Sequence, residues 1–268
     1  MPTDTTLQLI DIGVNLTDSA FSKDCDEVIE TAQACGVSTM IVTGTTLEES
    51  EQAIELCQQQ QPDILRCTAG VHPHYSSTFD TTTRQQLWAL AKEDAVVAIG
   101  ETGLDFNRNF STPEQQIHAF EQQLELACET GLPLFLHERD AHEKQLEMLS
   151  SCRDHFSRAV AHCFTGSRKE LYNYLDLDLY IGITGWICDE RRGTELQKLI
   201  KEIPADRLLL ETDAPYLIPR DMRPKPKSRR NLPQYLPHIL SKAAQLTGKE
   251  DQQLAQEVFN NSRYFFNL

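Results

Sequence analysis

The sequence has no apolar run long enough to cross a membrane. None of its segments approaches the roughly 18 consecutive apolar residues of a spanning helix. The first ten residues also lack the basic and then apolar layout of a secretory signal. We therefore expect a cytoplasmic location and no membrane partner.

Paired cysteines are absent as well. The eight cysteines are scattered singly along the chain, and no two of them form a CxxC motif. A reduced chain of this size needs no disulfide framework to fold. We interpret all eight as free thiols rather than as bridges or as a zinc-binding set.

Positive charge is scarce. The 25 lysines and arginines face 40 aspartates and glutamates, which gives a formal net charge of −15. This balance excludes a broad basic face for duplex nucleic acid, although it does not exclude a nucleic-acid substrate held in a cleft. Residues 220–230 are a local exception, because lysine and arginine outnumber acidic residues there.

Domain breaks are missing too. No change of composition, low-complexity tract or internal repeat divides the chain, so we expect residues 1–268 to form a single domain. Apolar residues make up 40% of the sequence and charged residues 24%, which is enough apolar material for a core. The length is close to the roughly 250 residues of an eight-stranded α/β barrel.

Strand-like apolar segments alternate with amphipathic helical patterns along the whole chain. We expect strands at 7–12, 39–43, 66–71, 96–105, 134–136, 159–161, 179–183 and 208–210. We expect helices at 24–35, 47–59, 82–92, 113–130, 141–152, 169–175, 193–203, 236–246 and 251–265. Eight strand and helix pairs favour an α/β fold of the (β/α)8 TIM-barrel type over a doubly wound sheet.

Several side chains carry local predictions. Thr112 and Pro113 form a helix start, and Gly131 a helix stop. We expect Trp88 to lie in the core and Asp140 to cap the helix that follows it.

Chemically active side chains follow most of the predicted strands. Glu101 ends an apolar run, His137 and His162 each follow one, and Asp213 follows the last strand. Any one of them alone is equally well explained as an ordinary paired or hydrogen-bonded residue. Because barrel strands deliver their carboxyl ends to one face, their coincidence favours a single site. Imidazole and carboxylate together suit zinc, manganese or magnesium, and Asp213 is a candidate either to bind the ion or to take a proton from a metal-bound water.

Several ordered motifs resemble those of one enzyme family. The segments are 11–16 (DIGVNL), 70–74 (GVHPH), 100–105 (GETGLD), 162–166 (HCFTG) and 211–216 (ETDAPY). They resemble the TatD family of metal-dependent deoxyribonucleases, and the resemblance spans essentially the whole chain. Residues 182–186 and 226–231 are similar to the subgroup of TatD proper.

The resemblance implies an amidohydrolase-type TIM barrel that hydrolyses DNA phosphodiester bonds with divalent metal ions. It implies a 3′–5′ exonuclease that prefers single-stranded DNA, with RNA as a further substrate, in DNA repair or degradation. Position by position, Glu101, His137 and His162 match metal ligands, and Asp213 matches the catalytic acidic residue and a further ligand. His72 matches a site histidine for which phosphate contact and general-acid catalysis both stay open. We expect magnesium in function, with zinc or manganese as alternatives, and a monomer.

One departure from the family concerns the first strand. Many relatives carry a His-x-His pair there, whereas this sequence has Gly13 and Asn15. Asn15 offers only a neutral oxygen, so we predict one tightly bound ion, with a second arriving with substrate.

Candidate substrate contacts are Arg139, Arg229 and Arg230 for phosphate groups and Trp186 for base stacking. The alternative for each arginine is an ordinary surface ion pair. Two rival functions stay open: a metal hydrolase of the same barrel that acts on a small amide, ester or lactone, and a binding protein without catalysis. The first lacks a position for a carbamylated lysine, because the fourth strand leads to Glu101.

Overall fold

The computed structural model describes residues 8–61 and 63–268, so Leu7 of the first predicted strand lies outside the described residues. Eight strands pair in parallel and in sequence order, from the first to the eighth. They are β1 (Leu9–Val14), β2 (Val37–Val42), β3 (Leu65–Ala69), β4 (Val96–Asp105), β5 (Leu134–Arg139), β6 (Ala159–Ala161), β7 (Tyr180–Ile183) and β8 (Leu208–Leu210). A parallel bridge between Val14 and Ala214 brings β1 beside the end of β8. The prediction of a (β/α)8 TIM barrel is confirmed.

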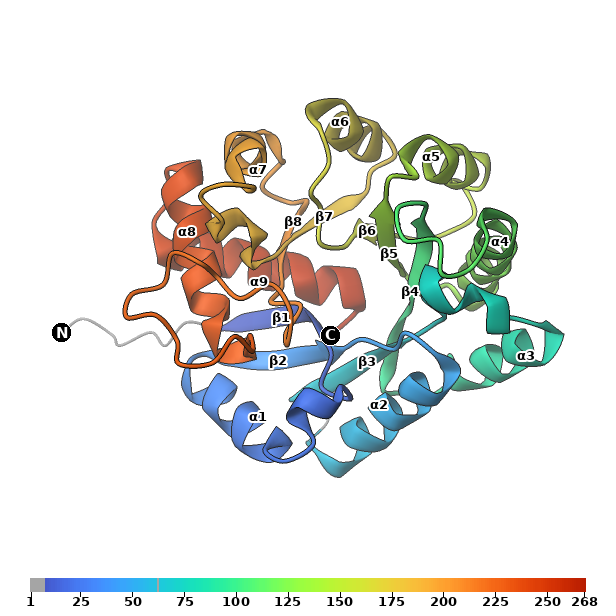
Figure 1. Ribbon diagram of the computed structural model, residues 1–268, viewed down its shortest axis with the longest axis horizontal. Helices are drawn as coiled ribbons and strands as arrows, with labels where there is room; N and C mark the ends of the chain where they lie inside the picture. Colours follow the sequence, from blue (N-terminus) through green and yellow to red (C-terminus); the bar gives the residue numbers. More distant parts are fainter. Residues whose placement is uncertain (1–7, 62) are drawn as a thin grey trace.

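All helices but the last form a ring around the strands, and the last packs against the first and eighth strands inside that ring (Figure 1). The helices are α1 (Cys25–Ala34), α2 (Leu47–Gln59), α3 (Thr81–Leu90), α4 (Pro113–Thr130), α5 (His142–Ser151), α6 (Arg168–Asp176), α7 (Thr194–Leu199), α8 (Leu236–Thr247) and α9 (Asp251–Phe266). Short 3-10 helices lie in the connections: η1 (Ser19–Phe21), η2 (Pro73–Thr78), η3 (Gly185–Cys188), η4 (Ile200–Glu202) and η5 (Pro233–Tyr235). Within the described residues, none of the helices has the length and hydropathy needed to span a bilayer.

Apolar side chains fill the barrel interior, and helices cover the outer face of the strands, so both faces of the strands are buried. Every residue of β1 and of β4 is buried. Ile12, Phe135 and Leu209 form an inner cluster with Phe265 and Phe266 of α9. Since this cluster also includes residues near the starts of the strands, α9 closes the amino-terminal end of the barrel. The opposite end, formed by the carboxyl ends of the strands, is left for chemistry.

The pairing of β4 and β5 continues past their apolar runs, so β5 runs further than the sequence predicts, whereas β4 has its predicted bounds. The pairing of β4 with β5 continues through Gly103 beside His137 to Asp105 beside Arg139. Glu101 therefore lies within β4 rather than at its end, and His137 lies within β5 rather than after it. Long-range pairing extended both strands past their apolar runs, which a reading of local hydrophobicity does not detect.

The predicted ends of α4 are confirmed. The Thr112 hydroxyl accepts a hydrogen bond from the backbone N–H of Gln115, and the Gln115 side chain accepts one from the backbone N–H of Thr112. Gly131 ends the helix in the left-handed region, at a φ of 71°. All eight cysteines are free, as expected.

Two side-chain predictions are wrong. Trp88 is 42% exposed, because it lies on the outer face of α3 with the Lys92 ammonium over its ring. Asp140 does not cap α5, whose N-cap is Ala141. Instead, Asp140 accepts a hydrogen bond from Asn107 at 2.5 Å and thereby joins the loops after β4 and β5.

Candidate metal centre and active site

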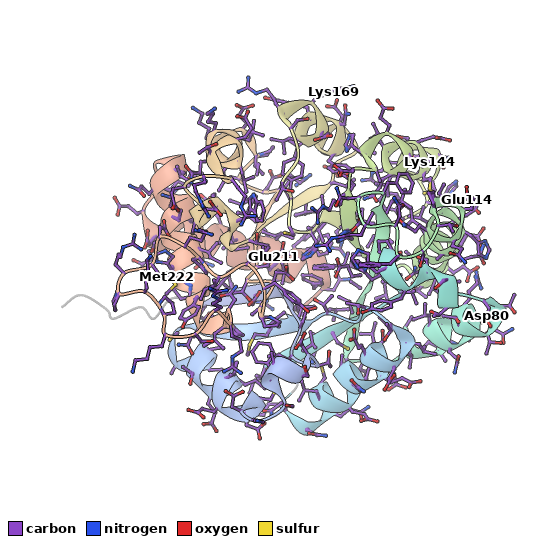
Figure 2. All side chains as sticks on the ribbon, in the orientation of Figure 1. Asp80, Glu114, Lys144, Lys169, Glu211 and Met222 are labelled. Carbon is purple, nitrogen blue, oxygen red and sulfur yellow. The ribbon has the colours of Figure 1, made fainter. Side chains whose placement is uncertain are left out.

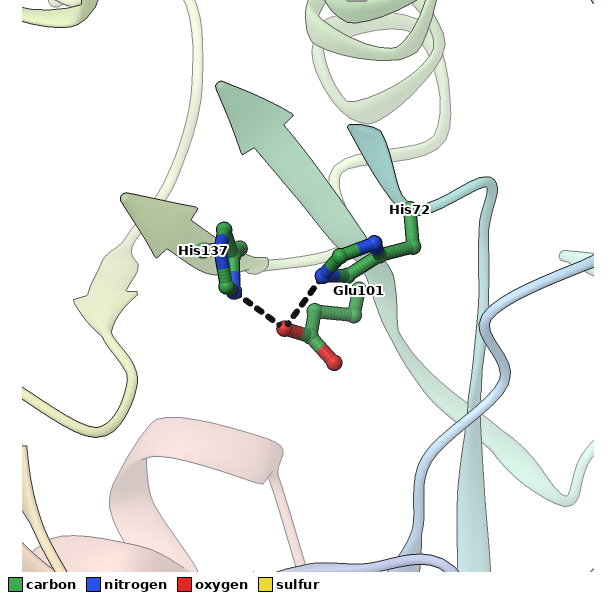
Figure 3. A group of neighbouring side chains, drawn as sticks. All are labelled: His72, Glu101 and His137. Carbon is green, nitrogen blue, oxygen red and sulfur yellow. Dashed lines mark hydrogen bonds and ion pairs between the residues drawn. The ribbon is translucent and has the colours of Figure 1, made fainter. Parts of the chain in front are cut away.

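Glu101 lies at the centre of three imidazole rings. Its Oε1 atom is 2.8 Å from His137 Nδ1, 3.4 Å from His72 Nε2 and 3.7 Å from His162 Nε2. Figure 3 shows His72 and His137 converging on this oxygen from the connection after β3 and from β5. The side chains that the sequence places at separate strand ends are therefore brought together, as predicted.

The carboxylates of this cluster are compensated by positive charge on neighbouring imidazoles. Burial disfavours the Glu101 carboxylate, but His72, His162 and a hydrogen bond with His137 hold its pKa well below the usual range. Burial also disfavours the charged imidazoles, yet Asp105 and Glu101 raise the pKa of His137 to about 9. Likewise, Glu211 and Glu101 raise the pKa of His162 to about 10 against burial. The protons that His137 and His162 hold near the carboxylates supply positive charge that a bound metal cation would supply in their place.

His72 has a defined tautomer. Burial lowers its pKa to about 4, although Glu101 opposes this effect, so the ring is neutral at pH 7. Its Nδ1 atom accepts the backbone N–H of His74 at 3.1 Å, which leaves the proton on Nε2. His72 therefore presents a neutral N–H donor to the site.

Glu211 orients His162 through a hydrogen bond to its Nδ1 atom. The Glu211 carboxylate is fully buried; its Oε2 accepts a hydrogen bond from His162 Nδ1, and its Oε1 accepts one from the backbone N–H of Cys163, both at 2.6 Å. A Cβ atom on Gly13 or on Gly182 would lie 2.6 Å from one of these oxygens, so two glycines enclose the carboxylate. Figure 2 shows Glu211 near the centre of the barrel, far from the labelled surface residues. The Nε2 atom of His162 is thereby turned toward Glu101.

Asp213 is a carboxyl group that titrates near neutral pH. It follows β8 in the left-handed region, at a φ of 55°, and its Oδ1 accepts a hydrogen bond from Asn15 Nδ2 at 3.1 Å. Burial raises the pKa of Asp213 to about 7; His162 opposes this rise, whereas Glu101 and Glu211 add to it. A group with this pKa both accepts and releases protons under ordinary conditions.

The donor atoms fit a divalent metal ion. His72, Glu101 and His137 form one group whose ligand atoms all lie within 4.8 Å of one another, and His162, Cys163 and Asp213 form a second. The Nε2 atom of His137 is buried and makes no hydrogen bond to any described residue; Asp105 Oδ2 is 3.6 Å away. An unpartnered imidazole nitrogen beside carboxylate oxygens is a suitable set of ligand atoms for zinc, manganese or magnesium.

The cluster opens into a cavity of about 510 Å³. Arg139 and Trp186, both predicted as substrate contacts, line this cavity together with the histidines. Arg229 and Arg230 are not among the described residues that line it. The Arg230 guanidinium binds the Asp24 carboxylate at 2.9 and 2.6 Å, as in the alternative of an ordinary ion pair, and its phosphate role stays a prediction. Arg229 is exposed, and its role stays a prediction.

Comparison with known proteins identifies the family. Residues 10–267 match the family described as TatD related DNase. The chain belongs to this family. It is 55% identical, over 97% of its length and 100% of the relative's, to a protein of Erwinia tasmaniensis named 3′-5′ ssDNA/RNA exonuclease TatD. A protein of Klebsiella pneumoniae with the same name is 54% identical over 97% of this chain and 98% of its own.

Solved TatD structures share the fold. A TatD homologue from Escherichia coli K12 superimposes with a TM-score of 0.89 at 28% identity, over 98% of this chain and 99% of that one. A TatD family hydrolase from Entamoeba histolytica gives a TM-score of 0.88 at 28% identity, over 97% and 98% of the two chains.

The geometry gives physical reasons for the departure from the TatD pattern on the first strand. Gly13 is needed because a side chain there would collide with Glu211. Asn15 directs its amide N–H toward Asp213 and toward the Ala214 carbonyl, so it orients the carboxylate of Asp213. The sequence interpretation of Asn15 as a weak oxygen donor to metal overlooked this hydrogen bond.

The sequence analysis missed two carboxylates, Asp105 and Glu211, that contact the histidines of the site. Asp105 Oδ2 is 2.7 Å from His74 Nε2, and its Oδ1 accepts the backbone N–H groups of Asn107 and Arg108. The signal was present, because Asp105 lies four residues after Glu101 on one strand, where an even spacing places side chains on the same face. Glu211, two residues before Asp213, carries a comparable signal.

Proposed function

We propose that this chain is a metal-dependent exonuclease that hydrolyses phosphodiester bonds of single-stranded DNA, and of RNA, from the 3′ end, in DNA repair or degradation. The observation that carries the proposal is the Glu101 carboxylate held among three imidazoles at the open end of the barrel. More than half of the sequence is identical to that of relatives named for this activity.

Glu101, His137 and His162 would hold the metal ion, with Asp213 beside them. Magnesium is the ion that we propose in function, with zinc and manganese as alternatives that the same donors accept. When bound, the ion supplies Lewis-acid stabilisation of charge on the phosphoryl oxygens.

The proton chemistry falls to Asp213 and His72. With a pKa of about 7, Asp213 is suited to accept the proton of the attacking water. His72 is neutral and presents Nε2–H, so it suits hydrogen bonding to a phosphate oxygen better than general-acid catalysis. Arg139, on the wall of the cavity, is a second phosphate donor.

We also propose that residues 1–268 form a single domain, that the protein is a monomer, and that it acts in the cytoplasm. A cytoplasmic protein keeps its thiols reduced, which agrees with eight free cysteines on scattered elements. Sedimentation analysis and cell fractionation test the oligomeric state and the location.

The test of the activity uses 5′-labelled single-stranded and double-stranded oligonucleotides of DNA and RNA, each with magnesium, manganese or zinc. We expect a ladder shortened from the 3′ end on single strands. Glu101→Gln and His162→Ala should reduce the rate by at least about 100-fold, because each removes a group at the centre of the cluster. Glu202→Gln, which removes a carboxylate paired with Arg168 on the outer surface, is the matched control.

A parallel assay with small esters and lactones tests the rival function, a metal hydrolase of the same barrel that acts on small molecules. Hydrolysis of the panel without hydrolysis of any oligonucleotide would overturn the nuclease proposal. Unchanged rates in both Glu101→Gln and His162→Ala would remove the proposed site.

A further inference from the structure

The connection after β7 holds a buried carboxylate that the proposed chemistry does not use. Asp189, which follows η3, is 2% exposed. Its Oδ1 accepts the backbone N–H groups of Arg191 and Arg192 at 2.9 and 3.1 Å. Its Oδ2 lies 3.2 Å from Arg192 Nε and 3.6 Å from Arg220 Nε. One carboxylate therefore fixes two guanidinium groups from separate segments of the chain.

This arrangement leaves positive charge at the surface. One arginine would neutralise Asp189, so the second guanidinium leaves a net charge of +1 on the group. The side chains of Arg192 and Arg220 are 59% and 41% exposed, so their remaining N–H groups face solvent. In a chain of net charge −15, a fixed pair of exposed arginines is a local attraction for an anion.

Trp186 connects the arginine pair to the active-site cavity. The indole lines the same cavity as Glu101, His162 and Asp213. The guanidinium carbon of Arg192 lies 4.5 Å from the centre of the indole ring, which holds the ring in place by a cation–π contact. Trp186 therefore links the cavity to Arg192, and Asp189 links Arg192 to Arg220 outside the cavity wall.

Two glycines allow the supporting segments to pack together. A Cβ atom on Gly185 would lie 2.2 Å from the Leu217 carbonyl oxygen, so the segment that leads to Arg220 approaches η3 more closely than a side chain would permit. A Cβ atom on Gly193 would lie 2.3 Å from the Trp186 carbonyl oxygen. The geometry of Trp186, Arg192 and Arg220 is thus built into the backbone.

We propose that Trp186, Arg192 and Arg220 form a nucleotide-binding ledge beside the metal centre. An unpaired base stacks on Trp186, the two arginines bind backbone phosphates of the same strand, and Asp189 is the residue that positions them. The inference rests on the proposed nuclease function and deepens it. Because a base within a duplex has no free face for an indole, the ledge selects single strands.

The test compares a long substrate with a minimal one. Trp186→Ala and Arg192→Gln are assayed on a single-stranded ten-nucleotide DNA and on bis(p-nitrophenyl) phosphate, a phosphodiester that carries no base and no neighbouring phosphate. For the DNA, we expect KM to rise about tenfold in each variant, with little change in kcat. For the minimal substrate, the loss in each variant should be much smaller than the loss for the DNA, because it offers no base and no second phosphate to the ledge. In Arg192→Gln, the slope of log KM against log salt should fall by about 0.7, the value for one lost phosphate contact on a single strand.

A binding measurement separates the ledge from the chemistry. Fluorescence anisotropy of the same labelled DNA, recorded with excess chelator, should give about tenfold weaker binding for both variants, and Trp186→Phe should restore most of it. Arg168→Gln, an equally exposed arginine paired with Glu202 on the outer surface, is the matched control and should bind as the wild type does.

The outcomes distinguish the two proposals. If the wild type binds the DNA and the variants bind it more weakly, but no protein cleaves it, the ledge stands and the nuclease proposal fails. If Trp186→Ala and Arg192→Gln match the wild type in binding and in salt dependence, the ledge is overturned whatever the activity. Weakened cleavage of the minimal substrate to the same extent as the DNA would also overturn it, because the effect would then be general.

Discussion

Among single residues, Glu211 has the largest indirect influence on the proposed metal centre. It is absent from the cavity wall, yet it bonds to His162 Nδ1 and to the backbone beside it. A hydrogen bond to Nδ1 fixes the tautomer and the direction of Nε2, which is the nitrogen turned toward Glu101. A buried carboxylate that touches no substrate can thus set the donor strength of a proposed metal ligand.

Replacement of Glu211 by glutamine should weaken metal binding without changing the fold of the barrel. A glutamine amide can donate to Nδ1, which moves the imidazole proton to Nε2 and blocks its lone pair. We expect the metal dissociation constant to rise about 10–100-fold. Isothermal titration calorimetry with manganese measures this change, and a saturating metal concentration should recover much of kcat. An unaltered dissociation constant would show that Glu211 does not act through His162.

The glycine at position 13 makes a second prediction at this scale. A methyl group there would press on Glu211 Oε2, which cannot move freely because it is buried and hydrogen-bonded. Gly13→Ala should therefore cost about 1–3 kcal/mol of unfolding free energy and weaken metal binding in the same direction as Glu211→Gln. Urea denaturation and calorimetry provide the two measurements. Gly131→Ala, where the added atom meets open space but the backbone is left-handed, is the comparison: it should lose stability through backbone strain and leave the metal affinity unchanged. For Gly13→Ala, loss of stability with unchanged metal affinity would contradict the link to Glu211.

At the scale of whole elements, the two ends of the barrel have separate tasks. The carboxyl ends of the strands carry the titratable cluster, while α9 places Phe265 and Phe266 against the residues at the strand starts. The rings of Tyr180 and Phe265 lie 5.0 Å apart in an edge-to-face contact. This end of the barrel contributes stability and no donor group of the proposed site.

Removal of the Phe265 ring tests this division of tasks. Phe265 is fully buried, so Phe265→Ala leaves a cavity and should cost about 3–5 kcal/mol. For a chain of this length, the melting temperature should fall by about 10 °C. Below the transition, kcat and KM should match the wild type, because the site lies at the other end. Tyr264→Ala, on the exposed side of α9, is the control. A large loss of activity in a folded Phe265→Ala protein would argue against the separation.

The elements also show which information the sequence contained. Apolar runs located all eight strands, and local caps such as Thr112 and Gly131 located both ends of α4, because these signals lie within a few residues. The extension of β5 through His137 depended on pairing with β4, which no local pattern reports. The ion pair of Arg230 was not foreseen for the same reason, because its partner Asp24 lies 206 residues away in the chain. The convergence of Glu101, His137 and His162 could be expected, because strand order in a barrel converts sequence position into spatial proximity.

For the whole molecule, the distribution of charge couples the binding of metal to the binding of nucleic acid. Acidic residues dominate the chain, and Glu101, Glu211 and Asp213 lie around one centre. A polyanionic strand is bound more weakly beside this centre until a cation compensates the carboxylates. Arg139 provides attraction on the cavity wall, and Arg192 and Arg220 provide it beyond Trp186. Binding of metal and binding of nucleic acid should therefore be cooperative.

Metal removal tests this picture of the whole molecule. The two donor groups differ in strength: the first contains Glu101, whereas the second contains Cys163, whose thiol pKa is raised well above its usual range by burial, Asp213 and Glu211. A protonated thiol is a poor ligand, so equilibrium dialysis should find one tightly held ion per chain. Stripping with chelator should abolish cleavage and lower the melting temperature by several degrees, since an ion at 100 times its dissociation constant contributes about 2.7 kcal/mol. Two tightly held ions per chain without substrate would contradict the prediction, as would a melting temperature that is indifferent to chelator.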